Sequence, residues 1–281
     1  MPAIKWYLQM LLKRVGLYNR LKTSFIYDIY WRVADSRVIE GRSREIRFYR
    51  DLLEGFQHGD LIFDVGANHG HKTDIFLRIG ARVLAIDPDE LNQEALRDKF
   101  LRCRWAKKPV TIVGKAVSDK SAVYKMWVDG PGSAKNTLSE KWVDTLRHDE
   151  VRFGHRLTFA QQKEVESISL EELMMRYGVP FFVKIDVEGH EPHVLRGLKR
   201  PVPYLSFEVN LPEFRQEGLE CIDLLGNIAA DGMFNYVVDC GQGLILDKWL
   251  MLSEFRQVFN SCSDSSLEVF WKTVSPSLNQ G

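Results

Sequence analysis

The spacing of apolar residues along the chain changes near residue 60. Before this point, apolar side chains recur three or four positions apart, and the polar residues fall on another face. These early apolar positions are Ile4, Tyr7, Leu8, Leu11, Leu12 and Val15, followed by an apolar and aromatic stretch from Leu21 to Val33. The spacing predicts helices. We therefore expect residues 1–58 to form a helical cap on the domain that follows.

From Asp60 onward, short apolar runs alternate with helical patterns. The runs read as strands are Leu61–Val65, Arg82–Ile86, Val110–Val113, Pro180–Ile185 and Tyr204–Val209. The helical patterns between and after them are Lys72–Ile79, Glu90–Leu101, Glu191–Leu198 and Pro212–Ala230. This alternation predicts a doubly wound α/β domain over residues 59–281, with a mainly parallel sheet and helices on both faces.

Two parts of the chain depart from this alternation. Near the end, Phe234–Val238, Leu244–Leu246 and Leu267–Trp271 are separated by short links, which predicts an antiparallel edge on the sheet. Asp129–Gln162 is a long polar insertion, and such segments in compact domains are commonly functional. It is either a lid hinged at Gly130–Ser133, with Trp142 over an acceptor, or a solvated loop.

Composition narrows the class of protein. The 281 residues include 45% hydrophobic and 27% charged residues and carry a formal net charge of +0, so nucleic acid is not an expected partner. No apolar run approaches the ~20 residues of a spanning helix. The four cysteines show no metal-binding spacing, which favours the cytoplasm. Residues 1–50 nevertheless contain 11 Lys or Arg against 4 Asp or Glu, so peripheral contact with the inner membrane surface is an alternative to the packed cap.

The segment Asp64–Gly70 follows a predicted strand and precedes a predicted helix. Its pattern, D-x-G-x-N-x-G, differs from the G-x-G-x-x-G of dinucleotide-binding folds. A carboxylate at Asp64 would repel a pyrophosphate, whereas it suits the ammonium group of S-adenosylmethionine. The second strand ends at Asp87, about twenty residues further on, where an acid binds ribose hydroxyls in such folds. Asp87 alternatively caps the helix that starts near Glu90.

Acidic residues also gather at the ends of later strands. Asp186 and Glu188 follow the fourth parallel strand, and Glu208 lies in the next one. Ligands of open α/β sheets bind beyond the carboxyl ends of the strands, so these acids should face one crevice. The alternative for Glu188 and Glu191 is that they only stabilise the first turn of the following helix.

The chain resembles the FkbM family of methyltransferases. The resemblance is carried by Asp64–Gly70 with Lys72-Thr73, Ala81–Pro88, Ala116–Ser118, Gly132-Ser133, Lys184–Glu191 and Phe207–Val209. It implies a Rossmann-like class I methyltransferase fold, S-adenosylmethionine as cofactor, and O-methylation of natural products or of sugars in glycolipids and polysaccharides. The chain departs from the family at Asp87, where Glu is common, and at His69 and His71 beside Gly70.

The predicted site has two parts. The cofactor-binding residues are Asp64, Gly66, Ala67, Asn68, Gly70, Thr73, Asp87, Ala116, Val117 and Asp186. The catalytic candidates are Asp186, Glu188, His190, Glu208 and Lys184. We expect Asp186 to act as the base or to orient the acceptor hydroxyl, and Lys184 to keep an acid ionised. Several of these residues and Asn210 are also possible metal ligands, but no tight ligand spacing is present and no metal is assigned.

Two other functional classes remain open at this stage. A nicotinamide-dependent oxidoreductase shares the alternating strands but lacks its glycine fingerprint here. An inactive partner protein in a glycan pathway would keep the fold and lose the site. The identity of the small-molecule or glycan acceptor and the oligomeric state do not follow from the sequence.

Overall fold

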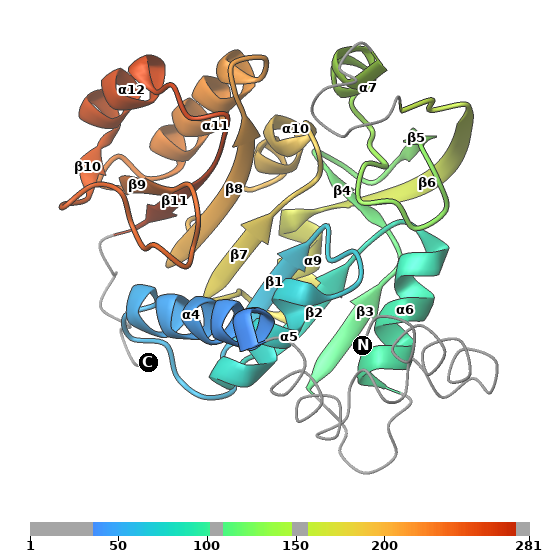
Figure 1. The fold of residues 1–281 in the computed structure, drawn as a ribbon, viewed down its shortest axis with the longest axis horizontal. Helices are drawn as coiled ribbons and strands as arrows, with labels where there is room; N and C mark the ends of the chain where they lie inside the picture. Colours follow the sequence, from blue (N-terminus) through green and yellow to red (C-terminus); the bar gives the residue numbers. More distant parts are fainter. Residues whose placement is uncertain (1–35, 102–108, 148–156, 274–281) are drawn as a thin grey trace.

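The computed structural model describes residues 36–101, 109–147 and 157–273. The helices predicted at Ile4–Val15 and Leu21–Val33 lie outside these residues. An eight-stranded sheet has the order β10-β9-β11-β8-β7-β1-β2-β3 (Figure 1). Its strands are β1 Leu61–Val65, β2 Arg82–Ile86, β3 Val110–Val113, β7 Phe182–Ile185, β8 Tyr204–Asn210, β9 Met233–Val237, β10 Leu250–Met251 and β11 Ser266–Lys272.

The pairing of the strands confirms the predicted fold class. Strands β3, β2, β1, β7 and β8 are parallel neighbours. Strand β11 runs antiparallel to both β8 and β9, and β10 runs antiparallel to β9. The sheet is therefore parallel in its centre and antiparallel at the C-terminal edge, as the short links between the last strands predicted.

Helices cover both faces of the sheet. The helices packed on one face are α4 Ser36–Leu52, α5 His71–Ile79 and α6 Glu90–Phe100. The helices packed on the other are α9 Leu170–Tyr177, α10 Glu191–Arg196, α11 Arg215–Ile228 and α12 Leu252–Ser261. Helix α4, the described part of the predicted cap, buries Tyr49 against Phe76 and Phe182 in the same core as the strands.

One predicted strand, Leu244–Leu246, is wrong. These residues form a loop, because the side chain of Asn235 takes the place of a partner strand. Asn235 Nδ2 donates to the Leu246 carbonyl at 2.9 Å, and Asn235 Oδ1 accepts from the Leu246 amide at 3.2 Å. The edge strand is instead β10, only two residues long, and it leads directly into α12.

The segment between β3 and β7 is more ordered than the sequence pattern indicated. It forms a second sheet, ordered β4-β6-β5, from β4 Ala116–Ser118, β5 Val123–Val128 and β6 Gln161–Ser169. The insertion itself contains α7 Glu140–Arg147, which buries Trp142, Val143 and Leu146. Trp142 packs edge-on against Phe214, with 4.9 Å between ring centroids, and is 1% exposed. It is a core residue, and its place over an acceptor stays a prediction.

The ends of β1 and β7 are in direct backbone contact at Gly66. Asp186 N donates to the Val65 carbonyl at 3.0 Å, immediately beside this glycine. A Cβ atom on Gly66 would lie 1.8 Å from the Asp186 carbonyl oxygen, and Gly66 has φ 82°. Both the steric contact and the left-handed backbone therefore require glycine. The first glycine of the D-x-G-x-N-x-G motif fixes the position of Asp186 as well as the turn itself.

We predict that Gly66→Ala destabilises the protein by roughly 3 kcal/mol or more, since neither backbone can retreat without breaking strand pairing. The matched control is Gly41→Ala in α4, where a Cβ would meet nothing within 4 Å. Alanine in that helix should be neutral or stabilising by about 0.5–1 kcal/mol. Urea unfolding followed by circular dichroism gives both values, and equal stabilities of the two variants would contradict this account.

Candidate active site

The carboxyl ends of β1, β2 and β7 and the start of β4 surround a cleft of about 680 Å³, hereafter the β1–β2 cleft. Of the predicted residues, those in its wall are Gly66, Asn68, Asp87, Ala116, Val117, Asp186 and Glu188. Residues of the insertion, from Ser133 to Leu138, complete the wall.

Asp87 organises the floor of this cleft. Its Oδ2 accepts from Asn68 N at 2.8 Å, and its Oδ1 accepts from Asp89 N at 2.9 Å and Asn92 Nδ2 at 3.1 Å. Burial raises the pKa of Asp87 to about 6 even though these donors oppose the shift. The alternative that Asp87 caps the next helix is wrong, because Asp89 is the N-cap and accepts from Leu91 N at 2.8 Å.

Asn92 supplies an unsatisfied acceptor in the wall of the cleft. Its side chain is 2% exposed, its Nδ2 is held by Asp87, and its Oδ1 has no hydrogen-bond partner. A buried acceptor without a partner is costly, so its presence in a cleft wall indicates a ligand donor. Ribose hydroxyls and the adenine amino group of S-adenosylmethionine are such donors. The residues present thus fit this nucleoside.

The insertion is tied down on both sides of the cleft. Asp89 Oδ2 accepts from Gly132 N at 3.2 Å and from Asn136 Nδ2 at 2.9 Å. On the other side, Thr137 Oγ1 donates to the Glu188 carbonyl at 2.7 Å. The loop therefore forms a fixed wall in this structure. Its role as a moving lid stays a prediction.

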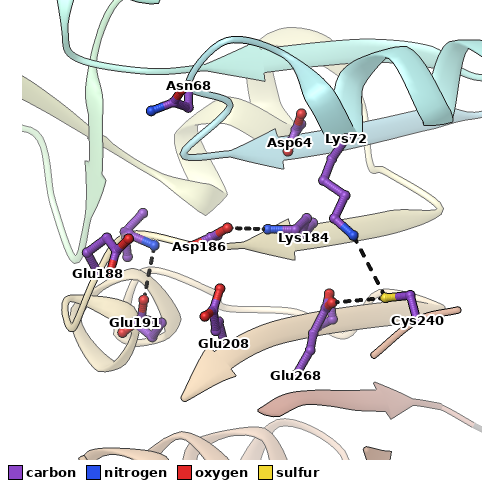
Figure 2. Close-up of polar contacts among 12 residues, drawn as sticks. Asp64, Asn68, Lys72, Lys184, Asp186, Glu188, Glu191, Glu208, Cys240 and Glu268 are labelled. Carbon is purple, nitrogen blue, oxygen red and sulfur yellow. Dashed lines mark hydrogen bonds and ion pairs between the residues drawn. The ribbon is translucent and has the colours of Figure 1, made fainter. Parts of the chain in front are cut away.

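A second, more polar cavity of about 630 Å³ adjoins the first, hereafter the polar cavity (Figure 2). Helix α4 contributes Glu45, and the first turn of α5 contributes Lys72. Strands β7, β8 and β11 contribute charged side chains from adjacent positions. Its charged lining consists of Glu45, Lys72, Lys184, Asp186, Glu208, Asp239 and Glu268.

The buried Lys184 and the partly exposed Asp186 form an ion pair at the centre of the cluster. The Lys184 Nζ lies 2.7 Å from Asp186 Oδ2, and Lys184 is 3% exposed. Burial opposes the charge on Lys184, but the surrounding carboxylates, Asp186 first, more than compensate and raise its pKa. Burial likewise opposes the charge on Asp186, yet Lys184 and a hydrogen bond with Glu208 lower its pKa. Both partners are therefore charged at neutral pH.

The neighbouring carboxyl groups are shifted in the opposite direction. Glu208 lies directly across from Glu268 in the β8–β11 pair. Burial, followed by the charges of Asp186 and Glu188, raises the pKa of Glu208 to about 8. Burial also raises the pKa of Glu188 to about 7, although Lys135 Nζ lies 3.0 Å away. Asp186 is thus an ionised carboxylate beside Glu208, which holds its proton at neutral pH.

The far side of the polar cavity is formed by Lys72 and its partners. Lys72 Nζ lies 2.8 Å from Glu45 Oε2 and 3.8 Å from Cys240 Sγ. Burial opposes ionisation of Glu45, but hydrogen bonds from His71 and Lys72 lower its pKa to about 2. Cys240 donates to Glu268 Oε2 at 3.5 Å, and burial raises the pKa of its thiol to about 12.

Several predicted cofactor residues support the cleft from behind and do not line it. Thr73 Oγ1 donates to the buried Asp64, which ties the start of α5 to β1. A Cβ on Gly70 would lie 2.6 Å from Leu96 and Phe100, so this glycine lets α6 pack closely. Ala67 is buried in the same core. Direct contact of Asp64 with an ammonium group therefore has no support from its position.

Two residues of the Lys184–Glu191 motif also lie apart from the cluster. His190 Nε2 is 3.1 Å from Ser118 Oγ, its ring stacks on His193, and burial lowers its pKa to about 3. It is neutral and lines neither cavity. Glu191 accepts from Val187 N at 3.0 Å and Gly189 N at 3.3 Å, so it holds the loop after β7. Over the described ranges, no group of three His, Cys, Asp or Glu residues is arranged to hold a metal ion.

Sequence reasoning missed important members of both cavities. Asn92 and Asn136 were not singled out, and neither were Glu45 and Glu268, which are distant in sequence from every motif. Lys72 lies inside a matching motif, and its charge directly after the glycine turn Asp64–Gly70 was the available signal. Glu45 and Glu268 gave none, since only the packing of α4 and β11 brings them to the site.

Comparison with known proteins gives a family-level match. The model of the family described as "Methyltransferase FkbM domain" matches residues 64–241. The hexuronic acid methyltransferase AglP of Haloferax volcanii is 26% identical over 181 residues, which are 64% of this chain and 64% of that protein. The chain thus spans less than two thirds of this relative.

Solved structures show only a distant likeness. An S-adenosylmethionine-dependent methyltransferase from Agrobacterium tumefaciens matches with a TM-score of 0.40 and 8% identity, over 81% of this chain and 60% of the other. A TehB-like methyltransferase from Corynebacterium glutamicum matches with a TM-score of 0.40 and 9% identity, over 82% and 87% of the two chains. Separately, no helix within the described part of the chain is long and apolar enough to cross a membrane.

The free acceptor on Asn92 generates a binding prediction. Asn92→Ala should weaken the binding of S-adenosylhomocysteine by roughly tenfold, since one buried hydrogen bond and a partner of Asp87 are lost together. Glu94→Ala, an exposed position on the same helix, is the control and should bind like the wild type. Isothermal titration calorimetry measures both. Equal affinities of Asn92→Ala and the wild type would remove Asn92 from the cofactor site.

Proposed function

Because the chain belongs to the FkbM methyltransferase family, we propose that it methylates a hydroxyl oxygen of a sugar-containing acceptor. Methyl transfer from S-adenosylmethionine is the chemistry of the family. The hydroxyl acceptor, its sugar character and the residue roles below are our proposal.

The observation that carries the proposal is the position of Asp186. Its side chain belongs to the wall of the β1–β2 cleft and also to the wall of the polar cavity. A cofactor in the first and an acceptor in the second would meet at this residue. Among the predicted acids that the structure describes, Asp186 alone lines both cavities. The reacting groups are thereby brought together, which is the main contribution an enzyme makes to a displacement.

Bound S-adenosylmethionine supplies an electrophilic methyl group, which forms a bond to the acceptor oxygen as the sulfur–methyl bond breaks and S-adenosylhomocysteine leaves. The hydroxyl proton must then be taken up. Asp186 is suited to accept it because Lys184, at 2.7 Å, keeps the carboxylate ionised. Glu208 keeps its own proton at neutral pH and orients Asp186 through their hydrogen bond.

The lining of the polar cavity supports a polyhydroxylated acceptor. Its wall carries charged groups from five elements and the hydroxyl of Ser266, which donates to Glu208 Oε1 at 3.2 Å. Val237, Val238 and Leu267 are its apolar part. Sugars offer many donors and acceptors to such a wall, whereas an apolar natural product would leave these groups unsatisfied. The relative AglP, a hexuronic acid methyltransferase by name, supports the same class.

The alternatives raised by the sequence are less well supported. The family match is to methyltransferases, which decides against a nicotinamide-dependent oxidoreductase. An inactive partner protein would require the catalytic arrangement to be lost, and here the Lys184–Asp186 pair is formed. A turnover assay separates an active from an inactive protein directly.

The proposed function is tested with methyl-labelled S-adenosylmethionine and a panel of sugars, sugar phosphates and uronic acids. We expect labelled methyl ether on one of these acceptors, with Asp186→Asn slower by about 10²–10⁴-fold. S-Adenosylhomocysteine should still bind this variant. Asp231→Asn, an exposed position, is the matched control. Full turnover by Asp186→Asn would remove the base assignment, and labelling of a carboxylate in place of a hydroxyl would correct the acceptor group.

The raised pKa of Glu208 predicts a loss of activity in alkaline solution. Above about pH 8 Glu208 ionises and adds a negative charge beside Asp186 and Glu268. We expect kcat/KM to fall above this pH in the wild type and to stay level in Glu208→Gln. Stability should change in the same sense. The pKa of Glu208 in the folded protein lies above the ordinary glutamate value of 4.5, so the proton on Glu208 stabilises the fold at low pH, and this contribution is lost as the pH rises towards 8.

Rate profiles and urea unfolding between pH 5 and 9 measure both effects. Glu164→Gln, an exposed glutamate on β6, controls for a general change in surface charge. An alkaline limb that persists unchanged in Glu208→Gln would assign it to another group.

A further inference from the structure

A third, open cavity of about 880 Å³ lies along α4, hereafter the α4 groove. Helix α4 provides Arg44, Arg47, Phe48, Asp51 and Leu52, and the loop after β9 provides Cys240–Leu244. Cys240 is also part of the wall of the polar cavity. Arg44 and Glu45 are consecutive on α4, and Glu45 faces the polar cavity. The α4 groove therefore adjoins the proposed acceptor site at Cys240.

Arg44 and Arg47 in the groove lack the polar contacts to described residues that Arg42 and Arg50 make on the same helix. Arg42 lies 3.8 Å from Asp74, and Arg50 donates to the Arg78 carbonyl at 3.2 Å. Arg44 and Arg47 are exposed, and neither forms an ion pair or hydrogen bond with any residue that the structure describes. They are three positions apart, so both guanidinium groups project from one side of α4. Asp51 is the acid in the same wall, which leaves an excess positive charge.

Among its described residues, the polar cavity has no unpaired cationic side chain that could bind an anionic group of the acceptor. Its two lysines are already engaged, Lys72 by Glu45 at 2.8 Å and Lys184 by Asp186 at 2.7 Å. Its remaining charged lining is acidic. An acceptor with both hydroxyls and an anionic group would thus place its hydroxyls in the polar cavity and its anion against the unpaired arginines.

We infer that Arg44 and Arg47 bind a phosphate group of the acceptor, so that the enzyme methylates a sugar carried as a phosphate or diphosphate ester. This inference rests on the proposed function. The guanidinium fork matches phosphate oxygens, and two arginines on one helix face can hold a monoester or a diphosphate. The loop lies beside Arg44 at Gly241, where a Cβ would be 3.4 Å from Arg44 Nε and 3.2 Å from Asp239 Oδ1. The groove is thereby closed on the side of the loop.

The first test uses probes that carry the phosphate without a particular sugar. Methyl phosphate and inorganic pyrophosphate are titrated into the wild type and followed by ³¹P NMR, which detects weak binding. Acetate in parallel titrations, followed through the protein signals, tests a carboxylate. We expect the phosphates to bind more tightly than acetate, and Arg44→Gln/Arg47→Gln to weaken them by roughly tenfold or more. Arg50→Gln on the same helix is the matched control and should bind like the wild type.

Equal phosphate affinity in the double variant and the wild type would overturn the inference, as would phosphate binding no tighter than that of acetate. Calorimetry with S-adenosylhomocysteine on the same samples separates this result from failure of the proposed function. Binding of that ligand with an unchanged phosphate affinity in the double variant rejects the arginine site alone. Loss of that ligand from the wild type rejects the proposed function itself.

Two further probes distinguish the sources of the phosphate. Uridine diphosphate represents a nucleotide-linked sugar, and octyl phosphate below its critical micelle concentration represents a lipid-linked one. The source is a nucleotide if uridine diphosphate alone binds more tightly than methyl phosphate, and a lipid if octyl phosphate alone does so. If both bind like methyl phosphate, the acceptor is a simple sugar phosphate.

Discussion

The contact between Gly66 and the carbonyl oxygen of Asp186 fixes the geometry on which both cavities depend. A side chain at residue 66 would lie 1.8 Å from that oxygen, so the ends of β1 and β7 meet only because glycine is present. The same contact places the Asp186 side chain between the β1–β2 cleft and the polar cavity. Gly66 is therefore required by the contact between β1 and β7, whether or not it also contacts a cofactor.

Burial and strand register determine which side chains of the cluster are charged. Lys184 is in register with Asp64 of β1 and Ser206 of β8. It forms an ion pair with Asp186, the residue directly after the end of β7. Glu208 faces Glu268 across the next pair. One lysine stabilises one neighbouring carboxylate, so Glu208 remains protonated up to about pH 8. The arrangement separates an ionised acid from a neutral one within the same cluster, which is the pattern expected where a proton is to be accepted.

The central sheet could be predicted from the sequence because each buried parallel strand is a short apolar run with a turn after it. Leu244–Leu246 is also a short apolar run, but the backbone of Leu246 bonds to the Asn235 side chain and not to a neighbouring strand. The local sequence pattern does not reveal this contact. Asp186 and Glu208 could be placed together because Asp186 directly follows one parallel strand and Glu208 lies in the next one. The sequence could not place Glu45, since its position depends on how Tyr49 of α4 packs between Phe76 and Phe182. His190 belongs to the matching motif, but its side chain points towards Ser118 and lines neither cavity.

The two cavities differ in which part of the chain builds them. Every residue in the wall of the β1–β2 cleft falls between Val65 and Glu188, inside the segment 64–241 that matches the family. The polar cavity takes Glu45 and Glu268 from outside that segment, and the α4 groove takes Arg44 and Arg47. The segment 64–241 that matches the family therefore contains the whole wall of the β1–β2 cleft but only part of the wall of the polar cavity. The polar cavity is completed where α4 packs on the sheet and β11 pairs with β8, so under the proposed function a change in these two elements would alter the acceptor site and leave the β1–β2 cleft unchanged.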